Sequence, residues 1–330
     1  MPQLNTKLGL LTFDKEQNWG QLVPPQTIHP IFGETITSRN DLEVRDIIVK
    51  TIDYKLAWTG NFTVSGGISL PFYYNLAGYF LYALFGKVET TELDTGIYKH
   101  VFTFSDVLPS FSTYVDRITA VFAYPGCMVN RGSFRFSADE MPITFDVDLI
   151  AKTELKYTGQ MPTVVIPNQK VFIRTGTAIK VNNSANNNVK SIDVNIDNRI
   201  DTRQSRTLTS GRFITDPARG APEVSGSVTS IFASMYEWEI FWGSPNQPAE
   251  IELTGVPIEL TVTGDTIGNT NYKNQFKLII PKAYLMARSN GTLSRAGEWI
   301  DVTFDFQAIY DVSYGYLASA ELINTHPSYT

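Results

Sequence analysis

Aspartates are the residues of this sequence whose spacing could support catalysis. Asp146 and Asp148 lie two positions apart in an alternating segment, so an extended strand would point both side chains to one face. Asp301 and Asp305 occupy the corresponding face of a second such segment. Two acids can hydrolyse a glycosidic bond when a cleft holds them at a suitable separation. Alternation alone places acids on any solvated strand face, so we favour a solvated face over a catalytic pair.

The histidines and the one cysteine predict neither an active site nor a metal site. His29, His100 and His326 lie far apart and show no metal-ligand spacing, so we expect each to be a surface or loop residue. Cys127 has no basic neighbour that would lower its pKa, and a buried structural thiol is the better interpretation. The sequence contains no phosphate loop, dinucleotide fingerprint or nucleophile elbow. We therefore expect no enzymatic activity and no cofactor.

The composition describes a globular protein that does not grip nucleic acid. A chain of 330 residues, 43% hydrophobic and 18% charged, is long enough for two domains of ordinary size. Its net charge of −6 argues against a phosphate-binding surface but is compatible with DNA that slides past. We find no signal peptide and no apolar run long enough to span a membrane. These features predict a soluble protein made in the cytoplasm, without a membrane partner.

Most segments predict β-strands, and two segments predict helices. Residues 143–149 and 302–308 alternate between apolar and polar positions, as half-buried strands do. Helices are expected at 76–85 and 235–242, both rich in aromatic residues, and we expect each to plug the open side of a β-sandwich. The expected caps are Asn75 and Gly86 for the first helix, and Ser234 with Glu237 and Gly243 for the second.

Several short motifs occur twice in the same order and predict a duplicated domain. One repeated motif, or echo, could arise by chance, whereas three echoes in the same order with a matched helix indicate that one unit was copied. The fold class we predict is mainly β, with two tandem β-sandwich domains that each carry one flanking α-helix. The first domain would span 1–160 with an N-terminal extension, followed by a linker at 161–170. The second would span 171–330, with a long loop at about 197–223 and a C-terminal tail. The echoes pair 64–69 with 224–229, 98–102 with 272–276, and 144–146 with 303–305.

The order and spacing of these motifs resemble those of two-domain tail tube proteins, the major tail proteins of long-tailed bacteriophages. The similarity extends from about Gly60 to Asp311, and no single motif in it is specific by itself. The segments that carry it are VSGGI at 64–68, ALFG at 83–86, YKHVFTF at 98–104, LPSFS at 108–112, YPGCMVN at 124–130, PITFD at 142–146, VKSIDVNIDN at 189–198, VSGSV at 224–228 and FQAIYD at 306–311.

The resemblance implies a structural virion protein and not an enzyme. Members of this family combine a β-sandwich and a flanking helix with a sheet that joins neighbouring subunits into a barrel. Rings of subunits would stack into the hollow tail tube through which the genome leaves. Six single-domain subunits make a ring, so three chains with two domains each would suffice. The implied partners are other copies of the chain, the tape-measure protein and a tail tip or initiator protein, with genomic DNA passing without specific binding. The implied location is the virion tail.

Two sets of residues are candidate functional sites under this interpretation. The loop at 197–223 resembles the arm with which such proteins contact adjacent subunits or rings, and its arginines would pair with acids there. Aspartates on the polar strand faces would line the channel with negative charge, which repels DNA phosphates. The candidate arm residues are Arg199, Arg203, Arg206 and Arg212, and the candidate lumen residues are Asp146, Asp148 and Asp305.

Two other functions are alternatives to the tail tube. A carbohydrate-binding or glycoside-cleaving β-sandwich protein would use aromatic residues as sugar platforms and Asp146 with Asp148 as acids. The aromatic residues fall mostly in the repeated helices and strands, which favours a core role. An outer-membrane barrel would require a signal peptide and a long series of strands with apolar outer faces. Rings or hollow filaments of the purified protein would support the tail tube, whereas a monomer that binds glycans would support the carbohydrate protein.

Overall fold

β-Strands make up most of the fold, which confirms the mainly β class predicted from the alternating segments. The computed structural model describes residues 6–164, 170–250, 253, 255–290 and 300–330. The predicted strands at 143–149 and 302–308 correspond to β9 and β17, and each buries its apolar side chains on one side. The elements are β1 (Leu10–Lys15), β2 (Gly33–Glu34), β3 (Thr37–Asp46), β4 (Lys55–Pro71), α1 (Ala77–Phe85), β5 (Gly86–Asp94), β6 (Ile97–Phe104), β7 (Phe111–Asp116), β8 (Val121–Ser137), β9 (Thr144–Ala151), β10 (Leu155–Tyr157), β11 (Thr177–Val181), β12 (Ser184–Ala185), β13 (Val189–Asp197), β14 (Glu223–Ile231), α2 (Tyr236–Trp242), β15 (Val256–Thr266), β16 (Lys273–Asn290), β17 (Asp301–Ala308) and β18 (Ser319–Asn324), with short 3-10 turns at Thr6–Leu8 and Arg174–Gly176.

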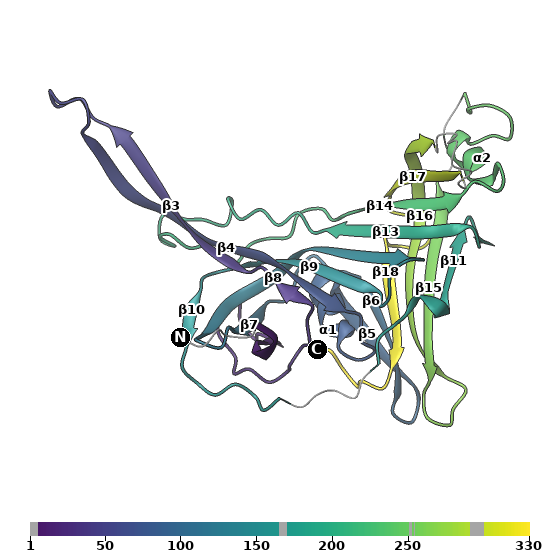
Figure 1. Cartoon of the computed structure of the whole chain (residues 1–330), viewed down its shortest axis with the longest axis horizontal. Coiled ribbons are helices and arrows are strands. Elements are labelled where there is room, and N and C mark those ends of the chain that lie inside the picture. Colours follow the sequence, from purple (N-terminus) through teal and green to yellow (C-terminus); the bar gives the residue numbers. More distant parts are fainter. Residues whose placement is uncertain (1–5, 165–169, 251–252, 254, 291–299) are drawn as a thin grey trace.

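A large antiparallel sheet runs through both halves of the chain (Figure 1). Its strands pair in the order β3, β4, β9, β8, β13, β14, β17 and β16, so β8 and β13 join the first half to the second. The long strand β16 also pairs with β15 and with β18, and β18 continues the sheet to β6 and β5. A smaller sheet contains β1, β7, β10 and the first part of β8. Strand β8 passes from one sheet to the other near Gly126, whose φ of +67° is a conformation that glycine adopts without strain.

One hydrophobic core extends across both halves. Phe134 on β8 stacks on Phe145 of β9 with ring centroids 4.4 Å apart, and Phe276 on β16 lies 5.7 Å from Phe134. Phe304 and Phe306 on β17 are also buried, as their alternating positions predicted. Because the sheet and the core continue across the boundary, the division into two domains stays a prediction. Part of the predicted linker, residues 165–169, lies outside the described residues.

The first predicted helix is α1, which packs against β8. It ends at Gly86, whose φ of +95° is left-handed, as the glycine stop predicted. The predicted N-cap is wrong: the cap position is Leu76, which offers no side-chain acceptor, and Asn75 lies one residue earlier. Nearly every residue of α1 is buried, because β1 and the C-terminal tail cover the helix. Phe80 of α1 stacks on Phe13 of β1 with ring centroids 4.4 Å apart.

The second predicted helix, α2, begins one residue later than expected and ends at Gly243, whose φ is +72°. Its N-cap is Met235, so the capping box predicted from Ser234 is displaced by one position. The Ser234 hydroxyl nevertheless accepts a hydrogen bond from the Tyr236 backbone N–H at 3.3 Å. Aromatic side chains of α2 pack on Phe304 of β17. In contrast to α1, none of the α2 side chains that the structure describes is buried.

The C-terminal segment connects the two halves. Strand β18 pairs on one side with β16 of the second half and on the other side with β6 of the first half. Beyond it, Tyr329 is 2% exposed and lies so close to Gly78 of α1 that a Cβ there would collide with the tyrosine ring. The Tyr329 hydroxyl donates to the Asn75 carbonyl at 2.6 Å and accepts from the Asn324 side chain at 2.7 Å. The tail of the second half therefore packs on the first half.

Candidate assembly surfaces

A continuous polar face crosses the large sheet on the side opposite the core. Side chains alternate along a strand, so every second residue of the paired strands points to this side. Strand registers align these residues into rows that run from the first half into the second, and we call this surface the polar face. Its rows are Ser69, Asp146, Ser133, Asn195, Ser225 and Gln307; then Gly67, Asp148, Arg131, Asp197 and Glu223; then Thr144, Arg135, Asp193, Ser227 and Asp305.

Arginines of the polar face are paired with acids. Arg131 donates to Asp197 at 2.8 Å, and this hydrogen bond raises the pKa of Arg131. Burial tends to raise the pKa of Asp197, but hydrogen bonds from Arg131 and from the Arg199 backbone N–H outweigh it and leave that pKa lowered. Arg135 lies 3.6 Å from Asp193, whose pKa is raised because partial burial outweighs the attraction of Arg135. These pairs neutralise the positive charge of the face.

The aspartates predicted to line a lumen all lie on the polar face and are exposed. Asp146 and Asp148 flank the buried Val147 on β9, and Asp305 lies between buried residues of β17. Among the described residues, none of the three aspartates forms an ion pair. The pKa of Arg131 is raised mainly by its hydrogen bond to Asp197, and the nearby charge of Asp148 raises it slightly further. The polar face therefore carries negative charge that its arginines do not neutralise fully.

A two-stranded hairpin projects from one end of the molecule (Figure 1). It consists of β3 and the first part of β4, which we call the β3–β4 hairpin, residues 37–63. None of these residues is buried, and Ile48 and Ile52 near the tip are 101% and 105% exposed. With about 3.4 Å per residue, the ten residues of β3 extend roughly 30 Å. This hairpin was not predicted from the sequence.

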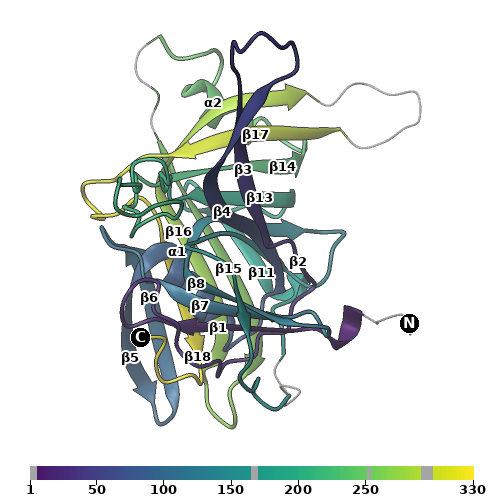
Figure 2. The ribbon, with the colours of Figure 1, turned by 90° about the vertical axis from the view of Figure 1, so that its left-hand side faces the viewer.

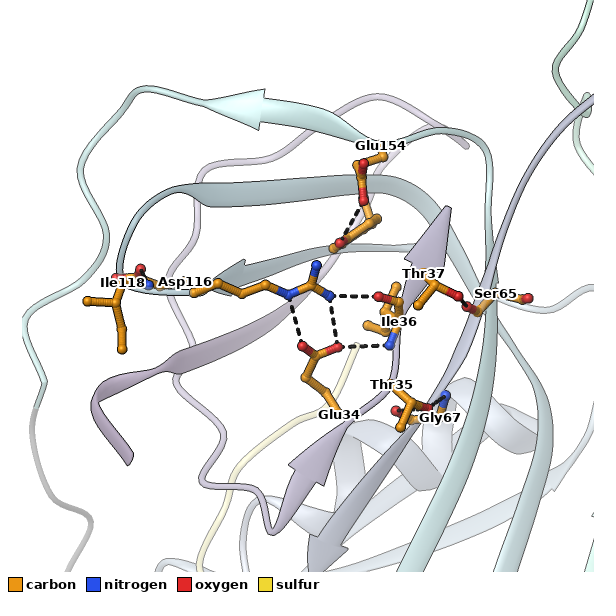
Figure 3. A network of polar contacts seen from close by, with 11 residues as sticks. Glu34, Thr35, Ile36, Thr37, Ser65, Gly67, Asp116, Ile118 and Glu154 are labelled. Carbon is orange, nitrogen blue, oxygen red and sulfur yellow. Dashed lines mark hydrogen bonds and ion pairs between the residues drawn. The ribbon is translucent and has the colours of Figure 1, made fainter. Parts of the chain in front are cut away.

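Hydrogen bonds fix the base of the β3–β4 hairpin to the body (Figure 3). Arg117, in the turn after β7, donates to both carboxylate oxygens of Glu34 at 3.0 and 3.1 Å, and to the Ile36 carbonyl at 2.6 Å. Glu34 in turn accepts from the Ile36 backbone N–H at 2.8 Å. Beside this network, Ser38 donates to Glu154 at 3.0 Å. The base is therefore held to the body by hydrogen bonds, while Ile48 and Ile52 near the tip are fully exposed.

The loop at 197–223 contacts both strands of the same hairpin. The Arg212 guanidinium donates to the Gly60 carbonyl at 2.8 Å and to the Asn40 side chain at 2.6 Å. The Phe62 backbone N–H donates to the Arg212 carbonyl at 3.0 Å, and the Phe62 and Phe213 rings lie 5.8 Å apart. One of the predicted arm residues thus contacts a projecting element of its own chain.

The other predicted arm residues differ in their surroundings. Arg199 forms an ion pair with Glu223, at the edge of the polar face. Arg203 is exposed and Arg206 is partly buried, and neither side chain forms an ion pair within the described part of the chain. The structure brings Arg199 and Arg212 to separate places and does not gather the arginines into one cluster. Their expected contacts with neighbouring subunits stay a prediction.

A family comparison identifies the kind of protein to which these surfaces belong. A family model described as phage tail tube protein matches residues 6–308, nearly the whole chain. The chain belongs to the phage tail tube protein family. No curated protein matches it. As a tail tube protein, it is a structural component of the bacteriophage tail that assembles with copies of itself into a tube, a role that requires no catalysis.

The histidines and the cysteine of this tail tube protein lie mostly in its interior. His29 is 2% exposed but lies in the segment between β1 and β2, so the expected loop position is confirmed although the residue is buried. His326 is partly buried and lies beyond β18, also outside the strands. His100 is 0% exposed and lies on strand β6, so the expectation of a surface or loop residue is wrong for it. Cys127 is buried as expected, and burial raises the pKa of its thiol to about 12. In the part of the chain that the structure describes, no three His, Cys, Asp or Glu residues are grouped to hold a metal ion. Within the same residues, no helix has the length and apolarity to cross a membrane.

Proposed function

We propose that three copies of this tail tube protein form a ring, and that rings stack into a hollow tube with the polar face as its inner wall. The observation that carries the proposal is the continuity of the polar face through both halves of the chain. Heterologous contacts close laterally into rings and stay open axially, so they can build a filament of any length. The phage genome would pass through this tube on leaving the virion.

Related strand pairings in the two halves support a trimeric ring of pseudo-sixfold symmetry. In the first half, β4 precedes α1 and pairs with β9, which pairs with β8. In the second half, β14 precedes α2 and pairs with β17, which pairs with β16. If the halves are copies of one domain, each chain contributes two similar segments of the wall. Three chains then supply the six segments that six single-domain subunits supply in a ring.

Negative charge on the inner wall would let DNA pass without adhering. Asp146, Asp148 and Asp305 are exposed and form no ion pairs among the described residues, so a phosphate backbone that approaches them is repelled. At physiological salt this repulsion extends about 8 Å, which makes it a property of the wall surface. Buried carboxylates without partners would be costly, which is a further reason to assign these residues to a solvated channel.

Contacts outside the lumen complete the proposal. We assign Arg199, Arg203, Arg206 and Arg212 to contacts with acids of adjacent subunits or rings, because the guanidinium group can bind a carboxylate with two hydrogen bonds. The intramolecular partners of Arg199 and Arg212 leave other donors of each guanidinium available. The tape-measure protein and a tail tip or initiator protein are the further partners that a tail tube requires.

The triple variant Asp146→Lys, Asp148→Lys and Asp305→Lys tests the assignment of the lumen. The three sites are solvated, so the variant should fold and form hollow filaments in negative-stain electron microscopy. Its filaments should retain short duplex DNA at low salt and release it as salt rises, because counterion release governs binding to lysines. The matched triple Asp→Asn variant removes the charge without reversing it and should retain much less DNA. A lysine variant that fails to fold, or whose filaments retain no DNA, would show that these faces do not line the lumen.

A further inference from the structure

In the described part of the chain, helix α2 is less buried than α1. On its inner side, Trp238 and Phe241 contact Phe304 of β17 with ring distances of 6.2 and 5.9 Å. No described side chain of α2 is buried, however, whereas nearly all residues of α1 are. Apolar side chains at both ends of the helix are exposed, and we call them with α2 the α2 patch. These residues are Phe232 at 36% exposure, Met235 at 40% and Leu253 at 40%.

The missing cover of α2 is explained by the path of the chain. In the first half, Phe13 of β1 and Tyr329 of the C-terminal tail pack over α1. The tail follows the second half but crosses to the first half, so it is not available to cover α2. Apolar surface left in water forgoes the stabilisation that burial gives, and a contiguous exposed apolar patch marks a site of interaction. Among the described residues, no segment covers α2 as the tail covers α1, and a second molecule can supply such a surface.

The β3–β4 hairpin also exposes apolar side chains, at the other end of the molecule. Two strands without further cover are marginally stable in water, and the hydrogen bonds that anchor this hairpin in the described part of the chain lie at its base. Besides Ile48 and Ile52, it exposes Val49 and Tyr54 around its tip at 49% and 45%. The hairpin and α2 lie at opposite ends of the longest axis in Figure 1, and both lie at the upper end of the view in Figure 2. The hairpin thus extends sideways, at the same level as α2.

We propose that the tip of the β3–β4 hairpin of one copy docks on the α2 patch of the next copy, covering α2 as the C-terminal tail covers α1. The contact is heterologous, because each chain gives one hairpin and receives one, and such contacts close into a ring. The partner is a second copy of this chain, and the aliphatic side chains of Ile48 and Ile52 pack against the aromatic helix. The inference rests on the proposed ring and names the contact that closes it.

Cysteine cross-linking between two variants tests the contact directly. One variant carries Ile48→Cys at the tip, and the other carries Met235→Cys on the α2 patch. The native Cys127 is buried and its thiol pKa is raised to about 12, so it does not contribute to the reaction. Mixed under mild oxidation, the variants should form the mixed disulfide on the order of a hundredfold faster than undocked thiols, because docking raises the effective concentration to the millimolar range. The matched control replaces Ile48→Cys by Leu208→Cys, a site that is 105% exposed, and should form no more disulfide than free thiols do.

The outcomes separate this contact from the proposed tube. Fast disulfide formation supports the contact whether or not the protein forms tubes, and a closed trimer without tubes would defeat only the stacking of rings. Tubes in which Ile48→Cys and Met235→Cys react no faster than the control would overturn the contact and leave the tube intact. As a second measurement, Ile48→Asp with Ile52→Asp should fold normally and lower ring formation at least about tenfold, since desolvating a carboxylate in the docked tip is costly. Equal ring formation by this variant and by Leu208→Asp would also overturn it.

Discussion

Replacing the buried His29 by phenylalanine should remove a large part of the acid sensitivity of the fold. His29 is 2% exposed, and the rings of Phe80 and Tyr79 meet it edge-on at 5.0 and 5.5 Å. Neither ring nitrogen has a hydrogen-bond partner among the described residues. Burial lowers the pKa of His29 to about 3, and the nearby Phe13 backbone offsets only a small part of this effect. The imidazole is therefore neutral in the folded protein.

The magnitude follows from the difference in proton binding between the two states. In the unfolded chain His29 regains its ordinary pKa of 6.5, so between pH 6.5 and pH 3 the unfolded state binds one more proton than the folded state. The stability due to neutral His29 is complete above pH 6.5 and is lost as the pH falls towards 3. With 1.36 kcal/mol for each pKa unit, the loss between pH 7 and pH 5 is about 2 kcal/mol. His100 and His326 also have lowered pKa values, mainly through burial, but they are present in both proteins and cancel in the comparison.

Urea unfolding followed by tryptophan fluorescence at pH 7 and pH 5 measures this difference. The free energy of unfolding of the unmodified protein should fall by about 2 kcal/mol more than that of His29→Phe. At pH 7 the variant should be similar in stability, because phenylalanine keeps the aromatic contacts and removes two unsatisfied nitrogens. A cavity of about 10 Å³ lies beside His29, close to the smallest size that holds a water. An equal pH dependence of the two proteins would refute the reasoning and indicate that the folded state accommodates the imidazolium.

Two further predictions concern the anchors of the hairpin and of the tail. Arg117→Ala should lower the free energy of unfolding by about 1–3 kcal/mol, because Glu34 and the Ile36 carbonyl lose their donors, and Arg117→Lys should restore only part of it; urea midpoints that match the unmodified protein would contradict the anchor. Tyr329→Phe should cost about 1–2 kcal/mol by leaving the Asn75 carbonyl without that donor, whereas the same change at an exposed tyrosine such as Tyr310, 56% exposed, should cost almost nothing.

Local patterns predicted those parts of the fold that depend on local physics. The strands at 143–149 and 302–308 were predictable because alternation fixes which face is buried. Both helices were predictable because each ends at a glycine, Gly86 or Gly243, in a left-handed conformation. The candidate lumen aspartates were found by the same alternation, which places them on an exposed face.

The elements that were missed depend on contacts between distant segments or between molecules. None of the residues of the β3–β4 hairpin is buried, and the alternation in β3 is short: Leu42 and Val44 lie between charged residues but are 64% and 49% exposed. A signal for this hairpin is the abundance of charged residues within 37–46, since charged side chains are typical of strands that are not covered by the body. Burial of His29 and His100 depends on the long-range approach of α1 and the C-terminal tail, which spacing along the sequence does not encode.

The strand registers relate the two halves differently from the echoed motifs, and the duplication itself stays a prediction. The echoed motifs match Asp146 with Asp305 and Gly67 with Ser227. In the sheet, Gly67 pairs with Asp148 and Ser227 pairs with Asp305. The registers therefore place Asp148, and not Asp146, in the position that corresponds to Asp305. The shift is two residues, which preserves the face of every side chain but moves each along the strand.

The motif glycines mark close backbone contacts in both halves. A Cβ at Gly66 would collide with the backbone of residues 35–36, and a Cβ at Gly226 would collide with the Asp193 carbonyl. At these two positions the glycine shared by the echoed motifs therefore reflects a close approach of backbone within each half. The tip of the β3–β4 hairpin has no counterpart in that repeat, whereas the helix of the α2 patch has a counterpart, α1, that is buried. The role proposed for these two surfaces follows from what the folded chain leaves exposed at its two ends.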